Sequence, residues 1–129
     1  MTEISLLNLT QDFIVRVNGL KIEQPIKFTL RELRNNSDWS KWQNLPGIYY
    51  FIQNSEILYI GRAFPSVGLG SRIKNQITSY GDAKWDAVIG DMDVILGMLI
   101  FPIEDWHWLA AVEVFLIERT KPKINKRCG

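Results

Sequence analysis

Cysteine and histidine are almost absent from this chain, whose 129 residues include one of each. The single cysteine, Cys128, has no partner for an internal disulfide, which favours a reducing compartment. Long apolar runs are also missing, since the longest, VILGMLIFPI, is too short to cross a bilayer and contains Gly97 and Pro102. The first residues lack the basic segment ahead of an apolar stretch that marks a secretory signal. We therefore expect a cytoplasmic protein with no membrane partner.

Net charge is small too, at +1, so the overall composition does not predict a nucleic-acid-binding protein. The C-terminal segment 112–129 differs, because its charged side chains carry an excess of three positive charges. Its cations are Arg119, Lys121, Lys123, Lys126 and Arg127, and its acids are Glu113 and Glu118. Such a basic segment can bind phosphates or can serve only solubility, and the sequence leaves both interpretations open.

The hydropathy pattern predicts one small α+β domain, with an antiparallel sheet of about three core strands flanked by helices. Residues 48–53 and 57–62 are predicted strands joined by a polar turn, and the apolar run 93–101 is typical of a central strand. Near the N-terminus, alternating residues around Asn18-Gly19 predict a hairpin. We expect residues 1–45 to form an extension packed on the same domain.

Three helices are expected. Thr29 and Glu32 form a capping-box pattern that predicts the start of a short helix. The segment 66–80 is rich in glycine and then has apolar residues at helical spacing. A third helix is predicted within 104–122, beginning at Asp105 and ending at Pro122.

The turn at Asn54-Ser55-Glu56 determines which side chains share a face of the sheet. A three-residue loop would place Gln53 opposite Ile57 and Phe51 opposite Tyr59. Tyr49 and Tyr59 would then lie on the same face, whereas a loop of even length would separate them.

Glu113 is the most informative single residue. Its neighbours at helical spacing are all apolar: Leu109, Ala110, Leu116 and Ile117. Burying even an uncharged polar group without a partner costs on the order of 2–7 kcal/mol. The sequence leaves three arrangements open: a salt bridge to a buried arginine, a helix rotated so that Glu113 lies at the rim, or a hard cation such as Mg²⁺ bound to the carboxylate.

Five short elements occur in a recognisable order. They are Gly47-Ile48-Tyr49, Tyr59-Ile60-Gly61, Leu69-x-x-Arg72, Glu113 and Pro122-x-x-Asn125. The two tyrosines are ten positions apart, and Glu113 precedes Pro122 by nine positions and Asn125 by twelve. Over about residues 46–127 the chain resembles the GIY-YIG nuclease family, which includes the N-terminal nuclease domain of an excinuclease, certain homing endonucleases and a few restriction enzymes.

The resemblance implies that residues 46–129 are a metal-dependent endonuclease domain that hydrolyses DNA phosphodiester bonds with one Mg²⁺ or Mn²⁺, in repair or recombination. It implies that Glu113 holds the cation, Tyr49 activates water, Tyr59 orients water or phosphate, and Arg72 stabilises developing negative charge. Because a free phenol is a poor base at pH 7, Tyr49 needs a positive charge nearby. Further residues expected to bind substrate are Arg62, Lys74 and Asn125, although Asn125 is more suited to bracing the end of the helix that carries Glu113.

Two features depart from the family pattern. Tyr59 and Arg72 are thirteen positions apart, where members of the family are often nearer ten. Gln76 occupies the position at which many members have a histidine or tyrosine relay, and Tyr80 is a candidate replacement. These departures keep two alternatives open: a nucleic-acid-binding domain with little or no cleavage, and a protein-interaction domain.

The sequence also predicts whether two ring side chains, Trp85 and His107, are exposed. We expect Trp85 to be exposed and able to stack on a base or a partner. The only histidine, His107, is expected at the surface. The sequence does not determine the oligomeric state, and a homodimer is one possibility.

Overall fold

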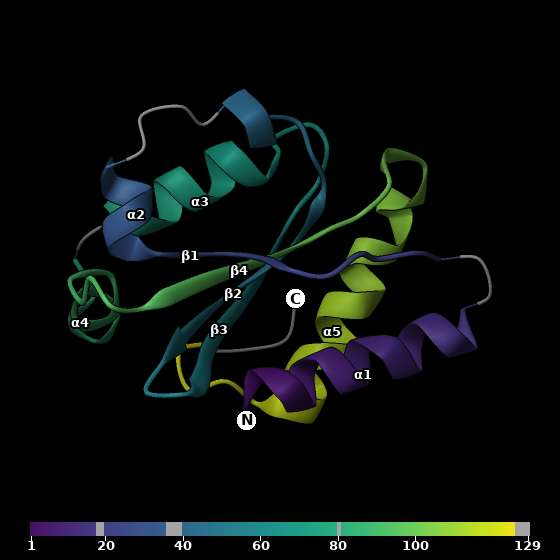
Figure 1. The fold of residues 1–129 in the computed structure, drawn as a ribbon, viewed down its shortest axis with the longest axis horizontal. Helices are drawn as coiled ribbons and strands as arrows, with labels where there is room; N and C mark the ends of the chain where they lie inside the picture. The colour runs from purple at the N-terminus through teal and green to yellow at the C-terminus, as the bar shows by residue number, and fades with distance from the viewer. Residues whose placement is uncertain (18–19, 36–39, 80, 126–129) are drawn as a thin grey trace.

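The computed structural model describes residues 1–17, 20–35, 40–79 and 81–125. These residues form an α+β fold, as predicted, with five helices and a four-stranded antiparallel open sheet of strand order β1-β4-β2-β3 (Figure 1). The strands are β1 Ile26–Thr29, β2 Gly47–Gln53, β3 Glu56–Ala63 and β4 Ile95–Ile100. The α-helices are α1 Glu3–Arg16, α2 Leu30–Asn35, α3 Leu69–Thr78, α4 Ala83–Ile89 and α5 Leu109–Thr120. Two 3-10 helices are η1 Ser40–Trp42 and η2 Ile103–Trp108.

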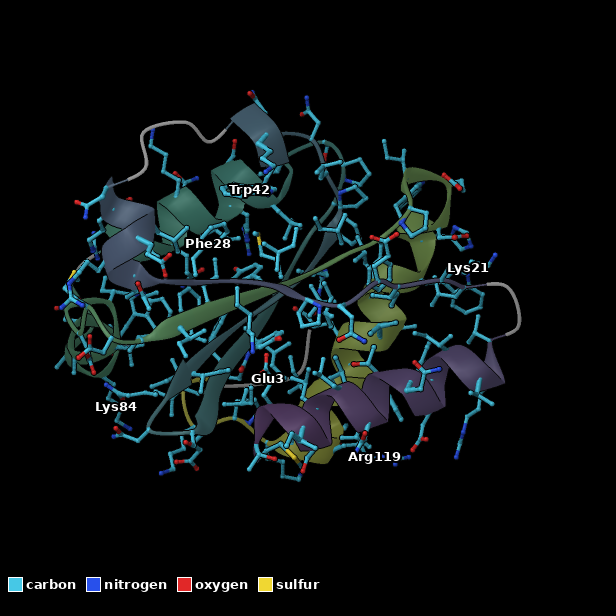
Figure 2. All side chains as sticks on the ribbon, in the orientation of Figure 1. Glu3, Lys21, Phe28, Trp42, Lys84 and Arg119 are labelled. Atoms are coloured by element: carbon cyan, nitrogen blue, oxygen red, sulfur yellow. The ribbon has the colours of Figure 1, made fainter. Side chains whose placement is uncertain are left out.

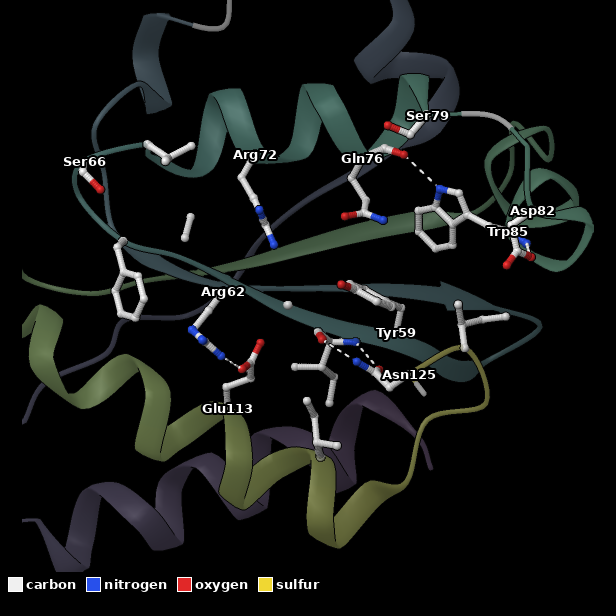
Figure 3. Close-up of a pocket in the computed structure, with 17 residues that line it drawn as sticks. Tyr59, Arg62, Ser66, Arg72, Gln76, Ser79, Asp82, Trp85, Glu113 and Asn125 are labelled. Carbon is white, nitrogen blue, oxygen red and sulfur yellow. Dashed lines mark hydrogen bonds and ion pairs between the residues drawn. The ribbon is translucent and has the colours of Figure 1, made fainter. Parts of the chain in front are cut away.

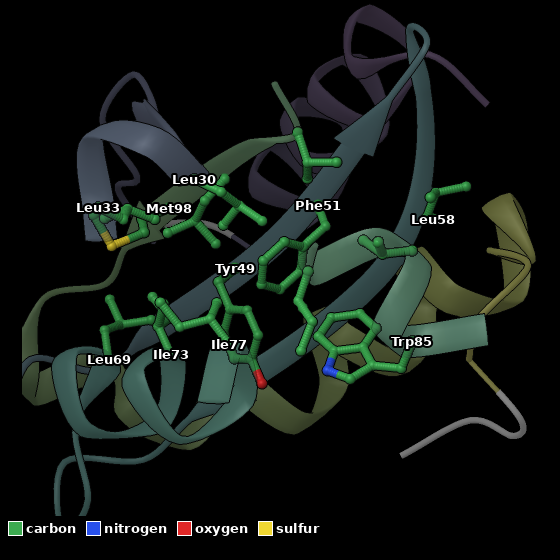
Figure 4. Close-up of a cluster of buried hydrophobic side chains, with 14 of the residues drawn as sticks. Leu30, Leu33, Tyr49, Phe51, Leu58, Leu69, Ile73, Ile77, Trp85 and Met98 are labelled. Atoms are coloured by element: carbon green, nitrogen blue, oxygen red, sulfur yellow. The ribbon is translucent and has the colours of Figure 1, made fainter. Parts of the chain in front are cut away.

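The sheet separates two apolar clusters, and side chains fill the space on both of its faces (Figure 2). Successive residues of β2 point to opposite faces because side chains alternate along a strand. Tyr49 and Phe51 therefore pack toward α3 and α4 (Figure 4), whereas Ile48 and Tyr50 pack toward α1 and α5. Since both faces of β2 are covered, six of its seven residues are buried.

The hairpin of β2 and β3 places Tyr49 and Tyr59 on one face, as predicted, but its turn and register differ from the prediction. The turn has two residues, Asn54 and Ser55, both with positive φ, and Gln53 pairs with Glu56 instead of Ile57. A bulge at Leu58 then adds one residue, so that Phe51 lies opposite Tyr59 as predicted. Without the bulge, a two-residue turn would place Tyr59 on the opposite face of the sheet from Tyr49.

Each of the two adjacent tyrosines of β2 lies over a glycine of a neighbouring strand. Tyr49 pairs with Gly61 on β3, and a Cβ atom at Gly61 would lie 2.4 Å from Cζ of Tyr49. Tyr50 pairs with Gly97 on β4, where a Cβ atom would lie 2.2 Å from Cζ of Tyr50. The missing side chains thus leave room for one phenol on each face of the sheet.

The predicted hairpin near the N-terminus is wrong. Residues Phe13–Arg16 belong to α1, which begins after Thr2, whose side chain accepts a hydrogen bond from the backbone N–H of Ser5. The alternation in this segment is too short to outweigh helical packing, in which the ring of Phe13 lies 5.4 Å from that of Phe115 on α5. Asn18-Gly19 lies outside the described residues.

The N-terminal residues also supply a strand that the hydropathy pattern did not predict. This strand, β1, pairs with β4 from Ile26 opposite Met98 to Thr29 opposite Ile95, and places β4 inside the sheet. The capping box is confirmed, because Thr29 Oγ1 accepts from the N–H of Glu32, and Glu32 Oε1 accepts from the N–H of Thr29.

The last helix begins later than predicted. Residues Ile103–Trp108 form η2, so α5 begins at Leu109 and not at Asp105. It ends at Thr120, where Lys121 adopts a left-handed conformation ahead of Pro122. None of the helices in the described ranges has the length and apolar character needed to cross a bilayer.

Candidate active site

A cavity of about 660 Å³ lies between β3, α3 and α5, and most of the predicted site residues line it (Figure 3). Arg72 enters from α3, Glu113 from α5, and Tyr59 and Arg62 from β3. Other side chains that line the cavity include Phe64, Gln76, Asp82, Trp85 and Asn125. Residues from three separate elements therefore meet at one concave surface, as the sequence predicted.

The two phenols lie side by side, with Tyr49 behind the cavity wall and Tyr59 on it. Their ring centroids are 6.1 Å apart, and Tyr49 is fully buried. The hydroxyl of Tyr49 donates to Oε1 of Gln76 at 3.3 Å. Burial raises the pKa of Tyr49 above its ordinary value, Tyr59 adds to the increase, and the positive charge of Arg72 acts in the opposite direction.

Helix α3 presents Arg72 and Gln76 to the cavity because they lie one turn apart on the same face. The adjacent face of the helix is anchored by Leu69, Ile73 and Ile77, which are buried. Lys74 is exposed and does not line the cavity. Its predicted contact with substrate therefore has no support from its position.

Glu113 forms an ion pair with Arg62, one of the two partners that the sequence left open (Figure 3). The side chain of Glu113 is 6% exposed and that of Arg62 is 29% exposed, so the acid is buried and the arginine faces the cavity. The guanidinium also lies 5.2 Å from the ring centroid of Phe64. Burial raises the pKa of Glu113, while Arg62 and, to a smaller extent, Arg72 lower it.

Any divalent cation here would depend on Glu113 alone among the predicted ligands. No three His, Cys, Asp or Glu side chains of the described residues gather as a metal site. A single carboxylate is nevertheless sufficient for Mg²⁺, which keeps several water ligands and commonly takes others from substrate phosphate. The residues therefore fit one hydrated cation, provided that Arg62 does not occupy the carboxylate at the same time.

Asn125 joins the C-terminal segment to β3 in the manner of a paired strand. Its Oδ1 accepts from the backbone N–H of Ile60 and its Nδ2 donates to the carbonyl of Ile60, both at 2.9 Å. The N–H of Ile124 donates to the carbonyl of Leu58 at the same distance. Asn125 thus braces the strand that carries Tyr59 and Arg62, which agrees better with a structural role than with substrate binding.

Asn125→Ala is expected to lower the free energy of unfolding by about 1–3 kcal/mol, because it leaves the polar backbone of Ile60 without partners. Urea unfolding measures this loss. Lys123→Ala is the matched control, since Lys123 forms only an exposed ion pair with Glu56 and should change stability by less than about 1 kcal/mol. Equal stability of the two variants would contradict the bracing role.

Trp85 is buried, not exposed as predicted. It lies on α4 with 6% of its surface accessible, and its Nε1 donates to the carbonyl of Gln76 at 2.9 Å. Its ring packs against Phe51 and Tyr59. Asp82 could have predicted the start of α4 from the sequence, because aspartate is a favoured N-cap residue. Its side chain caps the helix by accepting a hydrogen bond from the N–H of Trp85.

An aromatic rim beside the cavity was not predicted from the sequence. Phe64 lines the cavity, and its ring lies 6.0 Å from that of Trp106, which is 47% exposed. His107 is exposed, as predicted, with its ring 5.4 Å from that of Trp108. Tyr80, the suggested replacement for the relay residue, lies outside the described residues.

Comparison of the chain with protein-family models, with curated proteins and with solved structures finds no match. The motifs and the geometry of the cavity are therefore the features that indicate a function.

Proposed function

We propose that this protein is a metal-dependent endonuclease of the GIY-YIG type, which hydrolyses DNA phosphodiester bonds with a single Mg²⁺ or Mn²⁺. The observation that carries the proposal is that Tyr59, Arg72 and Glu113 line one cavity, with Tyr49 directly behind Tyr59. Glu113 is 41 residues beyond Arg72 in the sequence, so the fold, and not closeness along the chain, brings the two side chains to one cavity. DNA is the proposed partner. The cavity offers it arginines that can bind the phosphate and an acid that can hold a cation.

The arginines bind the scissile phosphate in this proposal. Guanidinium groups form paired hydrogen bonds to phosphate oxygens, and Arg62 and Arg72 reach the cavity from opposite walls. Arg72 also stabilises the negative charge that develops on the phosphate during attack. Glu113 would hold the cation, which when bound neutralises charge on the phosphate and on the leaving oxygen.

Tyr49 is the base in this proposal: its phenolate, formed after its own proton has passed to solvent, accepts a proton from Tyr59, which in turn takes one from the attacking water. In the free protein its phenol is protonated, because burial raises its pKa further above the neutral range. The positive charge of Arg72 favours the phenolate and offsets part of this effect. Gln76 fixes the orientation of the hydroxyl as a hydrogen-bond acceptor, but its amide cannot carry the proton away at neutral pH.

A second candidate function is DNA binding without efficient cleavage. Two observations favour it: Gln76 stands at the usual relay position, and Arg62 occupies the carboxylate that would hold the cation. A protein-interaction domain is less favoured, because it rested on Trp85 and on the acidic segment 81–93, and Trp85 is buried.

Nicking of supercoiled plasmid distinguishes these candidates. The wild-type protein should convert the plasmid to open circles with Mg²⁺ or Mn²⁺ and should be inactive with EDTA. The double variant Tyr49→Phe, Glu113→Gln, purified in the same way, should be inactive with either metal and so controls for contaminating nucleases.

DNA binding without nicking, insensitive to EDTA and weakened steeply by salt, would support the second candidate. The absence of both binding and nicking would contradict both candidates.

A further inference from the structure

We propose that Arg62 exchanges between Glu113 and a substrate phosphate, so that DNA and the divalent cation bind cooperatively. In the free protein Arg62 neutralises the carboxylate; when DNA is present, Arg62 moves to the phosphate and leaves Glu113 available to the cation. This inference rests on the proposed nuclease function and concerns how the same site is assembled.

The unequal exposure of the pair identifies which partner moves. Glu113 projects from α5 among buried apolar residues and is 6% exposed, so its position is set by the packing of the helix. Arg62 is 29% exposed and projects from β3, the edge strand, into the cavity. Its long side chain can reorient within the cavity while the acid stays in place.

The buried carboxylate needs a positive partner whether or not DNA is bound. A carboxylate that is 6% exposed among the apolar residues of a helix is strongly disfavoured without a compensating positive charge. Arg62 and a divalent cation would compete for the same oxygens, because two positive charges close together repel each other. Arg62 therefore blocks the cation until another anion attracts it.

The charges in the cavity favour phosphate as that anion. The lining holds Arg62 and Arg72 against Glu113 and Asp82, so its formal charges balance, and Asp82 caps α4. A divalent cation alone would add two positive charges to this balanced set, whereas a phosphodiester bound first supplies a negative charge that compensates part of them. The ring of Phe64 beneath the guanidinium offers Arg62 a flat surface along which to reorient.

Mn²⁺ binding, followed by the electron paramagnetic resonance signal of the free ion, tests the exchange without measuring activity. The wild-type protein should bind Mn²⁺ weakly alone and about tenfold more tightly with a cleavage-resistant phosphorothioate duplex, after correction for Mn²⁺ bound to DNA alone. The same duplex with uncharged methylphosphonate linkages should give no such increase.

Arg62→Gln removes the competitor of the cation. This variant should bind Mn²⁺ about tenfold more tightly than wild type in the absence of DNA, and the added effect of DNA should disappear. Lys74→Gln is the matched control for net charge, because Lys74 is exposed and lies off the cavity. It should behave as wild type.

If Arg62→Gln does not fold, Arg62→Lys provides the second variant, with an intermediate affinity expected because lysine makes a weaker, single-point contact. Unchanged Mn²⁺ affinity in the folded Arg62 variants, or equal affinity of wild type with and without DNA, would overturn the exchange. Glu113→Gln separates the exchange from the metal site on which it depends. If Glu113→Gln loses Mn²⁺ binding but the Arg62 variants bind Mn²⁺ as wild type does, the exchange alone is refuted. If Glu113→Gln still binds Mn²⁺ as wild type does, the metal site is refuted as well.

Discussion

Glu113→Gln is expected to reduce DNA cleavage by at least about 1000-fold and, at neutral pH, to raise the thermal unfolding temperature. The loss of activity follows because an amide does not replace the charge that would hold the cation, and metal catalysis supplies several kcal/mol of transition-state stabilisation. The gain in stability follows because the substitution removes a buried charge whose pKa burial raises. Arg62, which is 29% exposed, can turn to water when it loses its partner.

The raised pKa of Glu113 also determines how stability changes with pH. A carboxyl whose pKa is higher in the folded state than in the unfolded state binds its proton more tightly when folded. Its ionisation therefore disfavours folding, and this penalty is absent below the ordinary value of 4.5 and appears as pH rises through the raised folded value. The stability difference between Glu113→Gln and wild type should be largest near pH 7.5 and should shrink toward pH 4.

Plasmid nicking and thermal melts at these two pH values measure both effects. Glu118→Gln is the matched control, since Glu118 is an exposed acid on the same helix and should leave cleavage unchanged. A Glu113→Gln variant that cleaves at the wild-type rate would contradict the proposed site. A variant that melts below wild type at pH 7.5 would show instead that the ion pair with Arg62 outweighs the cost of burial.

Tyr49→Phe is expected to slow cleavage by about 100-fold or more, which is the usual contribution of a general base. Stability should change little, because the ring keeps its packing and the hydrogen bond from the hydroxyl to Gln76 is long, at 3.3 Å. Since burial raises the pKa of Tyr49 above 10.0, the phenolate fraction should increase about tenfold per pH unit across the neutral and mildly alkaline range. The wild-type rate should rise accordingly.

Single-turnover rates between about pH 6.5 and 9 test this expectation, because the variant should lose the dependence that Tyr49 confers. Tyr50→Phe provides the control from the adjacent position. The hydroxyl of Tyr50 donates to Oε2 of Glu3 at 2.6 Å on the opposite face of the sheet, so its removal should lower stability and spare activity. A Tyr49→Phe variant with the wild-type rate and pH profile would exclude Tyr49 as the base.

The fold class and the gathering of the site were predictable because local patterns and the motif order agreed. The capping box of Thr29 and Glu32, the helix anchored by Leu69, and the buried run that became β4 all follow from short-range rules. The hairpin shows the limit of such rules. The prediction that Tyr49 and Tyr59 share a face of the sheet was correct. It depends on a bulge at Leu58, which no residue of the loop predicts.

Other features depend on contacts between distant residues. The pairing of Arg62 with Glu113 joins residues 51 positions apart, so the sequence could state that the acid needs a partner but not which one it has. The N-terminal hairpin failed because a local Asn-Gly signal competed with the packing of α1 on α5. Trp85 was misplaced because its burial depends on Phe51 and Tyr59, which approach it only in the folded chain.

The close approach of Tyr49 to Gly61 means that the first and second tyrosine motifs are two halves of one steric unit. A Cβ atom at position 61 would lie 2.4 Å from the phenol, so a side chain there should be tolerated only when Tyr49 is also replaced by a smaller residue. Tyr50 and Gly97 impose the same rule on the other face. Distant descendants of this chain should therefore gain a side chain at position 61 or 97 only when the facing tyrosine has become smaller.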